Sequence, residues 1–368
     1  MASAITELEV ENIALSWLEE LGYEVVWGPD IAPDGGAPER SDWAETILIG
    51  RLEATIQEIN PTLPQQAIDE AMRKIKTIKS ASLVIDNKAF HKALVEGISV
   101  EYLTKEGTIR TGSVKIIDFE HIEHNAFLAV NQFTVIENKI ERRADIVLFI
   151  NGFPVSVIEL KNPADENATI WTAFNQLQTY KQQIPSLFTF NEALVISDGL
   201  DARIGTLTAN KEWFMPWHAI EDEHPADKNL PQLQVLIKGV FDKKRFLDII
   251  RHFIVFEDQG GGNYIKKMAG YHQYHAVNTA LKETVRATGA QGDKRIGVIW
   301  HTQGSGKSLT MAFFSGKVIL QPEMQNPTIV VITDRNDLDD QLFGTFSRCH
   351  ELLRQKPQQA ESRAHLRE

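Results

Sequence analysis

Cysteine, long hydrophobic runs and positive charge are all scarce in this sequence, and each shortage argues against a class of protein. A single cysteine, Cys349, allows neither a disulfide framework nor a cysteine-based zinc site, and it fits a reducing cytoplasm. No segment approaches the roughly 18 consecutive apolar residues of a membrane helix, and the acidic N-terminus does not resemble a secretion signal. With 50 acidic against 38 basic side chains, the net charge of −12 argues against nonspecific coating of nucleic acid, although a local basic cleft is compatible with it.

Length and composition indicate a folded protein with more than one domain. Hydrophobic residues make up 43% and charged residues 24% of the 368 positions, which excludes wholesale disorder. A chain of this length exceeds what one hydrophobic core usually serves. We predict a first domain over residues 1–216, a linker with a connecting helix over 217–262, and part of a second domain over 263–368.

The first domain is predicted to mix helices with a sheet. Its first helix follows a capping box formed by Thr6 and Glu9 and ends at Gly22. A densely apolar hairpin is expected over 144–160. Hydrophobic periodicity predicts further helices over about 45–58, 65–80 and 168–183, and strands over 98–103, 114–119, 127–137 and 193–197.

The second domain has the pattern of a parallel α/β sheet. It follows a polar linker (217–228), a largely helical segment (235–257) and a glycine break (260–262). Helices are predicted over about 271–287 and from Lys307, and strands over 295–300 and 328–333. A sheet of so few strands would leave an exposed edge, which favours aggregation or disorder.

The strand–loop–helix around Lys307 is the strongest chemical signal. The segment Thr302-Gln303-Gly304-Ser305-Gly306-Lys307-Ser308, called the phosphate loop below, matches most of the pattern G-x-x-x-x-G-K-[ST], although His301 stands where the first glycine is usual. Glycines allow backbone N–H groups to cradle phosphate oxygens at a helix N-terminus. Lys307 would reach the β- and γ-phosphates of ATP, and Ser308 would contact Mg²⁺. The alternative is a glycine-rich turn followed by an unrelated lysine.

Other residues near this loop are weaker indications. Gln273, at the start of the preceding helix, could recognise adenine, although an exposed glutamine is the simpler interpretation. The segment Thr333-Asp334-Arg335 ends an apolar strand, where α/β proteins place ligand contacts. A motor ATPase also needs an Asp-Glu pair after a later strand, and none follows Ser308. The pair Asp222-Glu223 lies in the polar linker and is interpreted as solvated.

A second constellation consists of Asp145, Glu159 and Lys161 in the apolar hairpin. These charges interrupt runs of Ile, Val, Leu and Phe that otherwise look buried, and burying an unpaired charge is expensive. Two carboxylates beside a lysine can bind Mg²⁺ and a substrate phosphate. The lysine can then orient or deprotonate the attacking water. The alternative is a buried salt-bridge cluster of Glu159 and Lys161 with Arg142 or Arg143.

The register of the hairpin decides whether these groups can meet. Asn151-Gly152 is a strong turn signal, but strict two-residue pairing would place Asp145 and Glu159 on opposite faces. A three-residue connection, Asn151-Gly152-Phe153, places them opposite each other, with Lys161 on the same face. We therefore predict a three-residue loop with Gly152 in the left-handed region, or an equivalent bulge.

Further residues were weighed against simpler structural roles. Gln176 and Tyr180, four apart on the next helix, would share a face near the carboxylates, or serve only as core residues. Two histidine pairs have a spacing compatible with metal, but a solvated or packing role is favoured because no third ligand is in view: His121/His124 and His272/His275. One glutamate of the first helix could add a carboxylate, although a solvated face is the simpler interpretation: Glu9, Glu11, Glu19 or Glu20.

Taken together, these motifs resemble a known family. Asp145…Glu159-x-Lys161 resembles the PD-(D/E)xK nuclease pattern, with Ala144 in place of its proline. Gln176-x-x-x-Tyr180 resembles a motif of one branch of that superfamily. With WHTQGSGKSLTM and VVITDRNDLDDQL following, the whole chain is similar to the restriction (R) subunit of type I restriction–modification enzymes. The resemblance implies an α/β fold: a nuclease-like mixed sheet flanked by helices over 1–216, then the beginning of a RecA-like P-loop lobe over 263–368.

The resemblance also implies functions for these residues. Such a subunit assembles with methyltransferase and specificity subunits, hydrolyses ATP to translocate duplex DNA, and cuts DNA away from the recognition site. The implied site residues are Asp145 and Glu159 for Mg²⁺, Lys161 for catalysis, Gln176 and Tyr180 for DNA contact near the site, residues 302–308 for ATP–Mg²⁺, and Gln273 for adenine. The later helicase motifs are missing, so the chain resembles an N-terminal fragment, and we expect little translocation or ATP turnover by this chain alone.

Three functions are therefore compared. The first is a Mg²⁺-dependent DNA endonuclease joined to an incomplete ATP-dependent motor. The second is a nucleotide hydrolase or kinase whose N-terminal domain only docks partners, and the third is a non-catalytic assembly module with both sites vestigial. A vestigial nuclease need not keep two carboxylates and a lysine on one hairpin, which favours the first function.

Overall fold

The structure is a computed structural model that describes residues 6–104, 107–162, 169–360, 362 and 364–366. The chain folds into two compact units, Met1–Arg251 and His252–Glu368. None of the described helices is long and apolar enough to cross a membrane.

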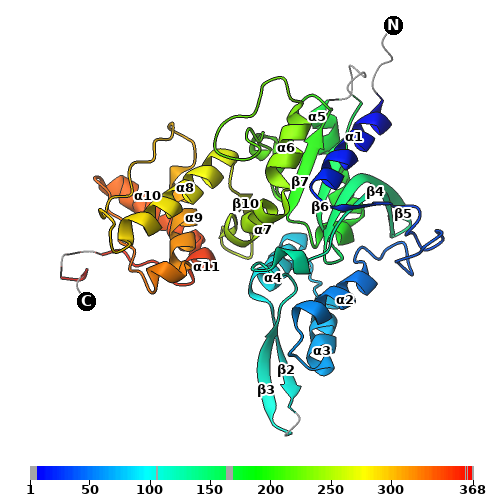
Figure 1. The fold of residues 1–368 in the computed structure, drawn as a ribbon, viewed down its shortest axis with the longest axis horizontal. Helices are drawn as coiled ribbons and strands as arrows, with labels where there is room; N and C mark the ends of the chain where they lie inside the picture. Colours follow the sequence, from blue (N-terminus) through cyan, green and yellow to red (C-terminus); the bar gives the residue numbers. More distant parts are fainter. Residues whose placement is uncertain (1–5, 105–106, 163–168, 361, 363, 367–368) are drawn as a thin grey trace. The chain divides into compact units, whose positions relative to one another are not determined.

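A six-stranded mixed sheet organises the first unit (Figure 1). β4, β5 and β6 form an antiparallel meander, while β1 joins β4 and β7 joins β6 in parallel, and β8 closes the far edge antiparallel to β7. The parallel β6–β7 pair requires a crossover, which the helix α5 provides. In sheet order the strands are β1 (Glu24–Trp27), β4 (Phe127–Glu137), β5 (Ile140–Ile150), β6 (Phe153–Leu160), β7 (Ala193–Ser197) and β8 (Ala202–Gly205).

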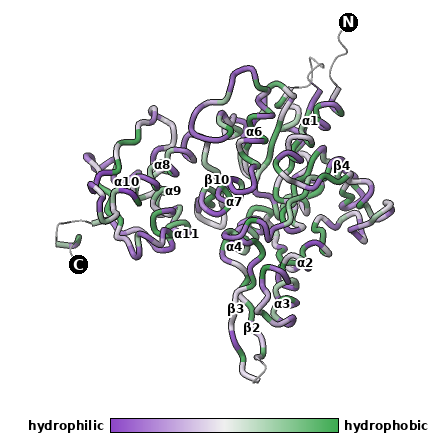
Figure 2. The backbone as a smooth tube through the Cα atoms, in the orientation of Figure 1, coloured by the Kyte–Doolittle hydropathy of each residue, from purple (hydrophilic) through white to green (hydrophobic). Residues whose placement is uncertain are grey.

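Helices flank this sheet, as the predicted mixed α/β architecture requires. α5 (Ile170–Gln183) packs on β5, β6 and β7, and its buried residues recur at helical spacing. α1 (Glu7–Glu20) contacts β1, β4 and β6 and begins with the predicted capping box. Every residue of β6 is buried, and hydrophobic segments run along the strands in Figure 2. Fully buried strands explain the nearly continuous apolar run of the hairpin.

A smaller group of elements lies between β1 and β4 in the sequence. The hairpin of β2 and β3 packs on α3, which also contacts α2. The predicted strand 114–119 is wrong: β3 ends at Val114, because the ladder with β2 is complete where Ile98 pairs with Val114. The elements are α2 (Ile49–Ile59), α3 (Gln65–Lys76), α4 (Leu83–Glu96), β2 (Ile98–Leu103) and β3 (Ile109–Val114); α4 was not predicted.

Most of the predicted linker belongs to the first unit. Trp217 is buried, and α6 (Gln232–Val240) contacts both α1 and β8. The division at Arg251 therefore differs from the predicted boundaries at 216 and 262, because apolar side chains of this segment complete the first core. Asp222-Glu223 lies in an exposed bend, as predicted. The remaining short elements are η1 (Ile122–His124), η2 (Pro185–Phe188), η3 (Lys211–Trp213) and α7 (Lys243–His252).

The second unit contains a small hairpin and helices, but its two predicted parallel strands are not formed. Segments 295–300 and 328–333 pair with no strand among the described residues, and Val298, Trp300 and Ile332 are 91%, 88% and 88% exposed. A strand needs neighbours to take up its backbone N–H and C=O groups. The elements are β9 (Ile254–Asp258), β10 (Tyr264–Met268), α8 (Tyr271–Thr288), α9 (Lys307–Ile319), η4 (Pro322–Met324), α10 (Asn336–Arg348) and α11 (His350–Leu353).

Candidate functional site

The β5–β6 hairpin reaches the required register through a bulge. Asn151 and Gly152 have φ of 52° and 85°, and Ile150 pairs with Phe153, so the connection is a two-residue turn and the three-residue loop is wrong. The register then shifts between Leu148 and Phe149, and from there Leu148 pairs with Ser156 and Ile146 with Ile158. The predicted alternative, an equivalent bulge, is confirmed. Continuing this register by one residue sets Asp145 opposite Glu159.

Asp145 lies at the start of the buried part of β5. Its side chain is 8% exposed, and its Oδ2 accepts a hydrogen bond from the Leu160 backbone N–H at 2.7 Å. Burial raises the pKa of Asp145 to about 6, although this hydrogen bond and the Lys161 amine oppose the rise. The carboxyl group is thus held at the end of β6 by the backbone itself.

Glu159 and Lys161 form a buried ion pair beside it. Lys161 Nζ donates to Glu159 Oε1 at 3.1 Å and to the Leu160 carbonyl oxygen at 2.6 Å. Glu159 is fully buried, and no hydrogen-bond partner reaches its Oε2 among the described residues. Burial, and then the neighbouring Asp145 carboxylate, raise the pKa of Glu159 well above its usual value. One amine thus faces two buried acids.

These groups fit a divalent cation by their chemistry. Carboxylate and carbonyl oxygens are the ligands that Mg²⁺ prefers. Glu159 Oε2 has no hydrogen-bond partner among the described residues, so it is an oxygen that a cation could take up. Within the described part of the chain, no group of three or more His, Cys, Asp and Glu side chains gathers to hold a metal. Water, backbone or substrate oxygens would have to complete a coordination shell around Asp145 and Glu159.

The arginines do not join this cluster as the salt-bridge alternative requires. Arg142 Nε donates to Gln183 Oε1 at 2.6 Å, and the Arg143 side chain is exposed. Of that alternative, the Glu159–Lys161 pair is present, and among the described residues neither Arg142 nor Arg143 forms an ion pair with it.

Gln176 and Tyr180 lie on α5 and contact each other. Gln176 Nε2 donates to Tyr180 Oη at 2.6 Å, and Tyr180 Oη donates to the Arg143 carbonyl at 2.9 Å. Burial, and then Glu159, raise the pKa of Tyr180. The helix thus links its polar pair to the strand that carries Asp145, while a contact with DNA stays a prediction.

The first helix supplies one buried glutamate near the site. Glu11 is 2% exposed; its Oε1 accepts from Asn131 Nδ2 at 2.7 Å and its Oε2 from Gln132 Nε2 at 2.5 Å. Its charge contributes to the raised pKa of Asp145. The solvated-face interpretation is therefore wrong for Glu11, whereas Glu9, Glu19 and Glu20 are exposed. The sequence carried no signal for Gln132, whose φ of 51° interrupts the β4 ladder opposite Asp145.

The phosphate loop leads into α9 with two glycines in the left-handed region, Gly304 at φ 81° and Gly306 at φ 77°. Lys307 Nζ donates to the carbonyls of His301 at 3.2 Å and Thr302 at 2.8 Å. The amine thus lies against the loop backbone that precedes its own helix.

Gln273 braces this loop from α8. It is 5% exposed, so the interpretation as an exposed glutamine is wrong. Its Nε2 donates to the Gly306 carbonyl at 3.1 Å, and its Oε1 accepts from the Gly270 N–H at 2.9 Å. The recognition of adenine by Gln273 stays a prediction.

One histidine of each pair lies within hydrogen-bond distance of an oxygen of the chain. His124 Nδ1 is 2.9 Å from Asp118 Oδ2, and His272 Nε2 is 3.0 Å from the Ser305 carbonyl oxygen.

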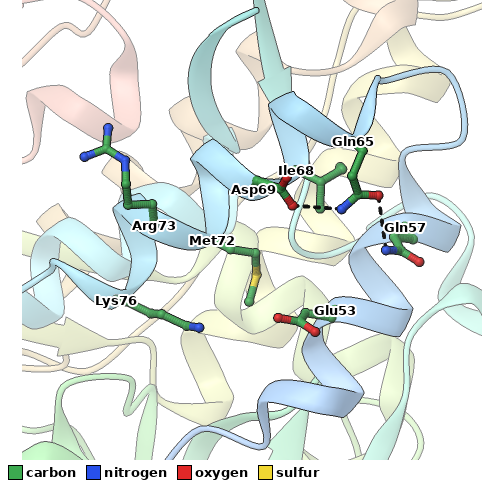
Figure 3. A pocket seen from close by; sticks show the side chains of 8 residues that line it. All are labelled: Glu53, Gln57, Gln65, Ile68, Asp69, Met72, Arg73 and Lys76. Atoms are coloured by element: carbon green, nitrogen blue, oxygen red, sulfur yellow. Dashed lines mark hydrogen bonds between the residues drawn. The ribbon is translucent and has the colours of Figure 1, made fainter.

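A pocket of about 430 Å³ lies between α2 and α3, away from the hairpin (Figure 3). Glu53 lines it from α2, whereas Asp69, Arg73 and Lys76 line it from α3, and Gln65 Nε2 donates to Asp69 Oδ1 at 2.9 Å. No residue of β5, β6 or α5 lines this pocket, so it is not part of the carboxylate site.

Comparison with known proteins agrees with this architecture. Residues 4–213 match the family described as type I restriction enzyme R protein N terminus, and residues 272–368 match the SWI2/SNF2 ATPase family. The chain is 43% identical to the type I restriction enzyme HindI endonuclease subunit of Haemophilus influenzae, over 99% of this chain and 35% of that protein. It is 33% identical to a putative type I restriction enzyme MjaIXP endonuclease subunit of Methanocaldococcus jannaschii, over 98% of this chain and 35% of that protein.

The chain thus spans about a third of the length of these curated relatives. Its first-unit match alone covers more than half of the sequence, from residue 4 to residue 213. This protein belongs to the family of type I restriction enzyme R proteins, through the N-terminal region that defines that family.

Proposed function

We propose that this chain carries the Mg²⁺-dependent DNA endonuclease site of the R subunit of a type I restriction–modification complex. The observation that supports it most is the bulged register that sets Asp145 opposite Glu159, with the Lys161 amine beside them. Burying two acids around one amine lowers the stability of the fold, so their presence favours a role in chemistry. The similarity to type I restriction enzyme endonuclease subunits supports duplex DNA as the proposed substrate.

In this proposal the hairpin residues have separate tasks. Asp145 and Glu159 hold Mg²⁺, which when bound stabilises the charge that develops on the phosphate. Lys161, now hydrogen-bonded to Glu159 and Leu160, orients the attacking water and, as a cation, stabilises the negative charge on the phosphate. Tyr180 and Gln176 keep α5 aligned with β5 and support the DNA nearby.

The second unit supplies the nucleotide site of the proposal. Residues 302–308 cradle ATP, with Lys307 at its phosphates and Ser308 at Mg²⁺. Gln273, now bonded to Gly306, adjoins this loop and is the proposed adenine reader. In the whole protein, ATP hydrolysis drives translocation of duplex DNA, in a cytoplasmic complex with methyltransferase and specificity subunits.

Plasmid cleavage by the assembled enzyme tests these assignments. Asp145→Ala is expected to abolish cleavage and leave ATP hydrolysis intact, whereas Lys307→Ala is expected to abolish both. Glu141→Ala is the matched control, because Glu141 is an exposed acid on the same strand. Cleavage that survives Asp145→Ala would remove the nuclease assignment and leave a nucleotide hydrolase whose first unit only docks partners.

A further inference from the structure

We propose that Arg203 and Lys211, held against Trp171, bind the phosphate backbone of the DNA a few nucleotides from the carboxylate site. The proposal rests on the proposed nuclease function and extends it. It assigns to this chain a cationic contact, called the 203/211 site below, that would fix the position of the strand to be cut.

The sheet places Arg203 in the same cross-strand row as Glu159. Glu159 on β6 pairs with Ile196 on β7, and Ile196 pairs with Arg203 on β8. Side chains at directly paired positions point to the same face of a sheet. With strands about 4.8 Å apart, the Cα atoms of Arg203 and Glu159 are separated by roughly 10 Å.

That separation suits neighbouring phosphates of one DNA strand. Phosphates follow one another every 3.4 Å or so along the helix axis, so a row of roughly 10 Å spans about three of them. A phosphate near Asp145 and Glu159 would therefore leave another within reach of the 203/211 site. Ile196, the middle residue of the row, is fully buried beneath α5, so the DNA strand would run along the carboxyl ends of β6 and β7, from the two acids to the arginine.

Trp171 at the start of α5 holds both cations in place. The Arg203 guanidinium lies 5.3 Å from the centre of the Trp171 ring, and Lys211 Nζ lies 5.6 Å from it and 5.8 Å from the Phe174 ring. The negative ring face attracts these cations without using their hydrogen-bond donors. Lys211 is exposed, and the Arg203 side chain is 33% exposed, so both head groups stay open to a ligand.

One acid competes for this site. Asp201 Oδ2 is 3.3 Å from Arg203 Nε. The Asp201 side chain is 40% exposed and the Arg203 side chain is 33% exposed. An exposed pair of this kind contributes little to stability, so a phosphate can replace the carboxylate at low cost. Asp201 thus gives the proposal a variant expected to act in the opposite direction.

The test measures binding of the full chain to a fluorescent DNA duplex of about 30 base pairs, with Ca²⁺ in place of Mg²⁺, at several salt concentrations. We expect the double variant Arg203→Ala, Lys211→Ala to weaken binding at least tenfold. The slope of log K against log salt should fall by about 1 to 2, since each phosphate contact accounts for roughly 0.9. Asp201→Asn should bind as tightly as the unmodified chain, or a few-fold more tightly.

Lys92→Ala is the matched control. Lys92 is an exposed lysine on α4, the helix whose Phe90 packs against Phe153 at the opposite end of β6. Its replacement should change neither affinity nor slope. Lys211→Glu guards against misfolding, because it alters only an exposed side chain, and it should weaken binding more than Lys211→Ala.

The outcomes separate this inference from the proposed function. If the double variant and Lys211→Glu bind DNA with unchanged affinity and slope, the 203/211 site is overturned, whatever the cleavage assay shows. A loss equal to that of Lys92→Ala would also overturn it, because it would show only a general charge effect. If binding falls as expected while Asp145→Ala still cuts plasmid in the assembled enzyme, the DNA contact stands and the nuclease assignment fails.

Discussion

Two apolar strands of the first unit and two apolar segments of the second unit are similar in composition but differ in structure. The former pair in a sheet, and the latter form no strand among the described residues. β5 and β6 are surrounded by strands and covered by α5, and their residues are buried from Ala144 to Ile150 and from Phe153 to Leu160. Segments 295–300 and 328–333 pair with no described strand and expose their hydrophobic side chains. The comparison teaches that a run of Ile, Val and Phe specifies a strand only where other strands can accept its backbone hydrogen bonds.

The largest contrast should appear when an aromatic residue is removed from each region. Phe149→Ala should lower the free energy of unfolding by about 3–5 kcal/mol, because Phe149 is fully buried and the surrounding core cannot fill the cavity. Trp300→Ala should change it by less than about 0.5 kcal/mol, since Trp300 is 88% exposed. Urea unfolding of both variants measures this, and equal losses would show that Trp300 is packed in solution.

A second contrast concerns the two lysines assigned to chemistry. Lys161→Met should lower the free energy of unfolding by about 3 kcal/mol at neutral pH, because it leaves two buried acids without their amine. Lys307→Met should leave stability nearly unchanged, since Lys307 is exposed. Thermal unfolding compares the two. A stable Lys161→Met variant would mean that the acids are protonated or solvated in the fold.

Glycine replacements sharpen the comparison at the two turns. Gly152→Ala should destabilise by about 1–3 kcal/mol, because φ is 85° and a Cβ would lie 2.5 Å from the Leu48 carbonyl oxygen. Gly304→Ala meets no neighbouring atom within 4 Å, so it should cost only the φ strain of about 1 kcal/mol. Chemical denaturation gives both values, and the reverse order would place the strain at the phosphate loop.

The smallest expected effect is the pH dependence of the Asp118–His124 pair. The hydrogen bond to Asp118 raises the pKa of His124, so this contribution to stability is present below the ordinary histidine pKa and is lost as the pH rises through the raised value. Burial acts to raise the pKa of Asp118, but hydrogen bonds from His121 and His124 leave it below its usual value. The contribution of the Asp118 carboxylate to stability is therefore lost only as the pH falls through the lowered pKa of Asp118.

His124→Gln tests this. The variant should lose more thermal stability relative to the unmodified chain at pH ~5.5 than at pH ~8.5, since only the charged histidine is affected. An equal loss of thermal stability at both pH values would mean that His124 stabilises the fold equally in its neutral and charged forms.

Much of the candidate site could be predicted because it depends on strand parity. A shift of one residue in the β5–β6 pairing places three side chains on one face: Asp145, Glu159 and Lys161. The bulge between Leu148 and Phe149 provides that shift. The position of the bulge could not be predicted, because it depends on how β5 pairs with both neighbouring strands. Glu11 was only one of several candidates, since its burial depends on two amides of β4 that are distant in sequence.

The sequence by itself determined the local structure: the capping box of α1, the Asn151-Gly152 turn, the glycines before α9 and the helix periods, because these depend on near neighbours along the chain. Only the tertiary structure decided which apolar segments became strands, where the predicted linker packed, and that Gln273 lies buried beneath the phosphate loop. It also decided the row that joins Glu159 to Arg203. These features depend on hydrogen bonds and burial between segments far apart in the sequence, whose partners no local pattern identifies.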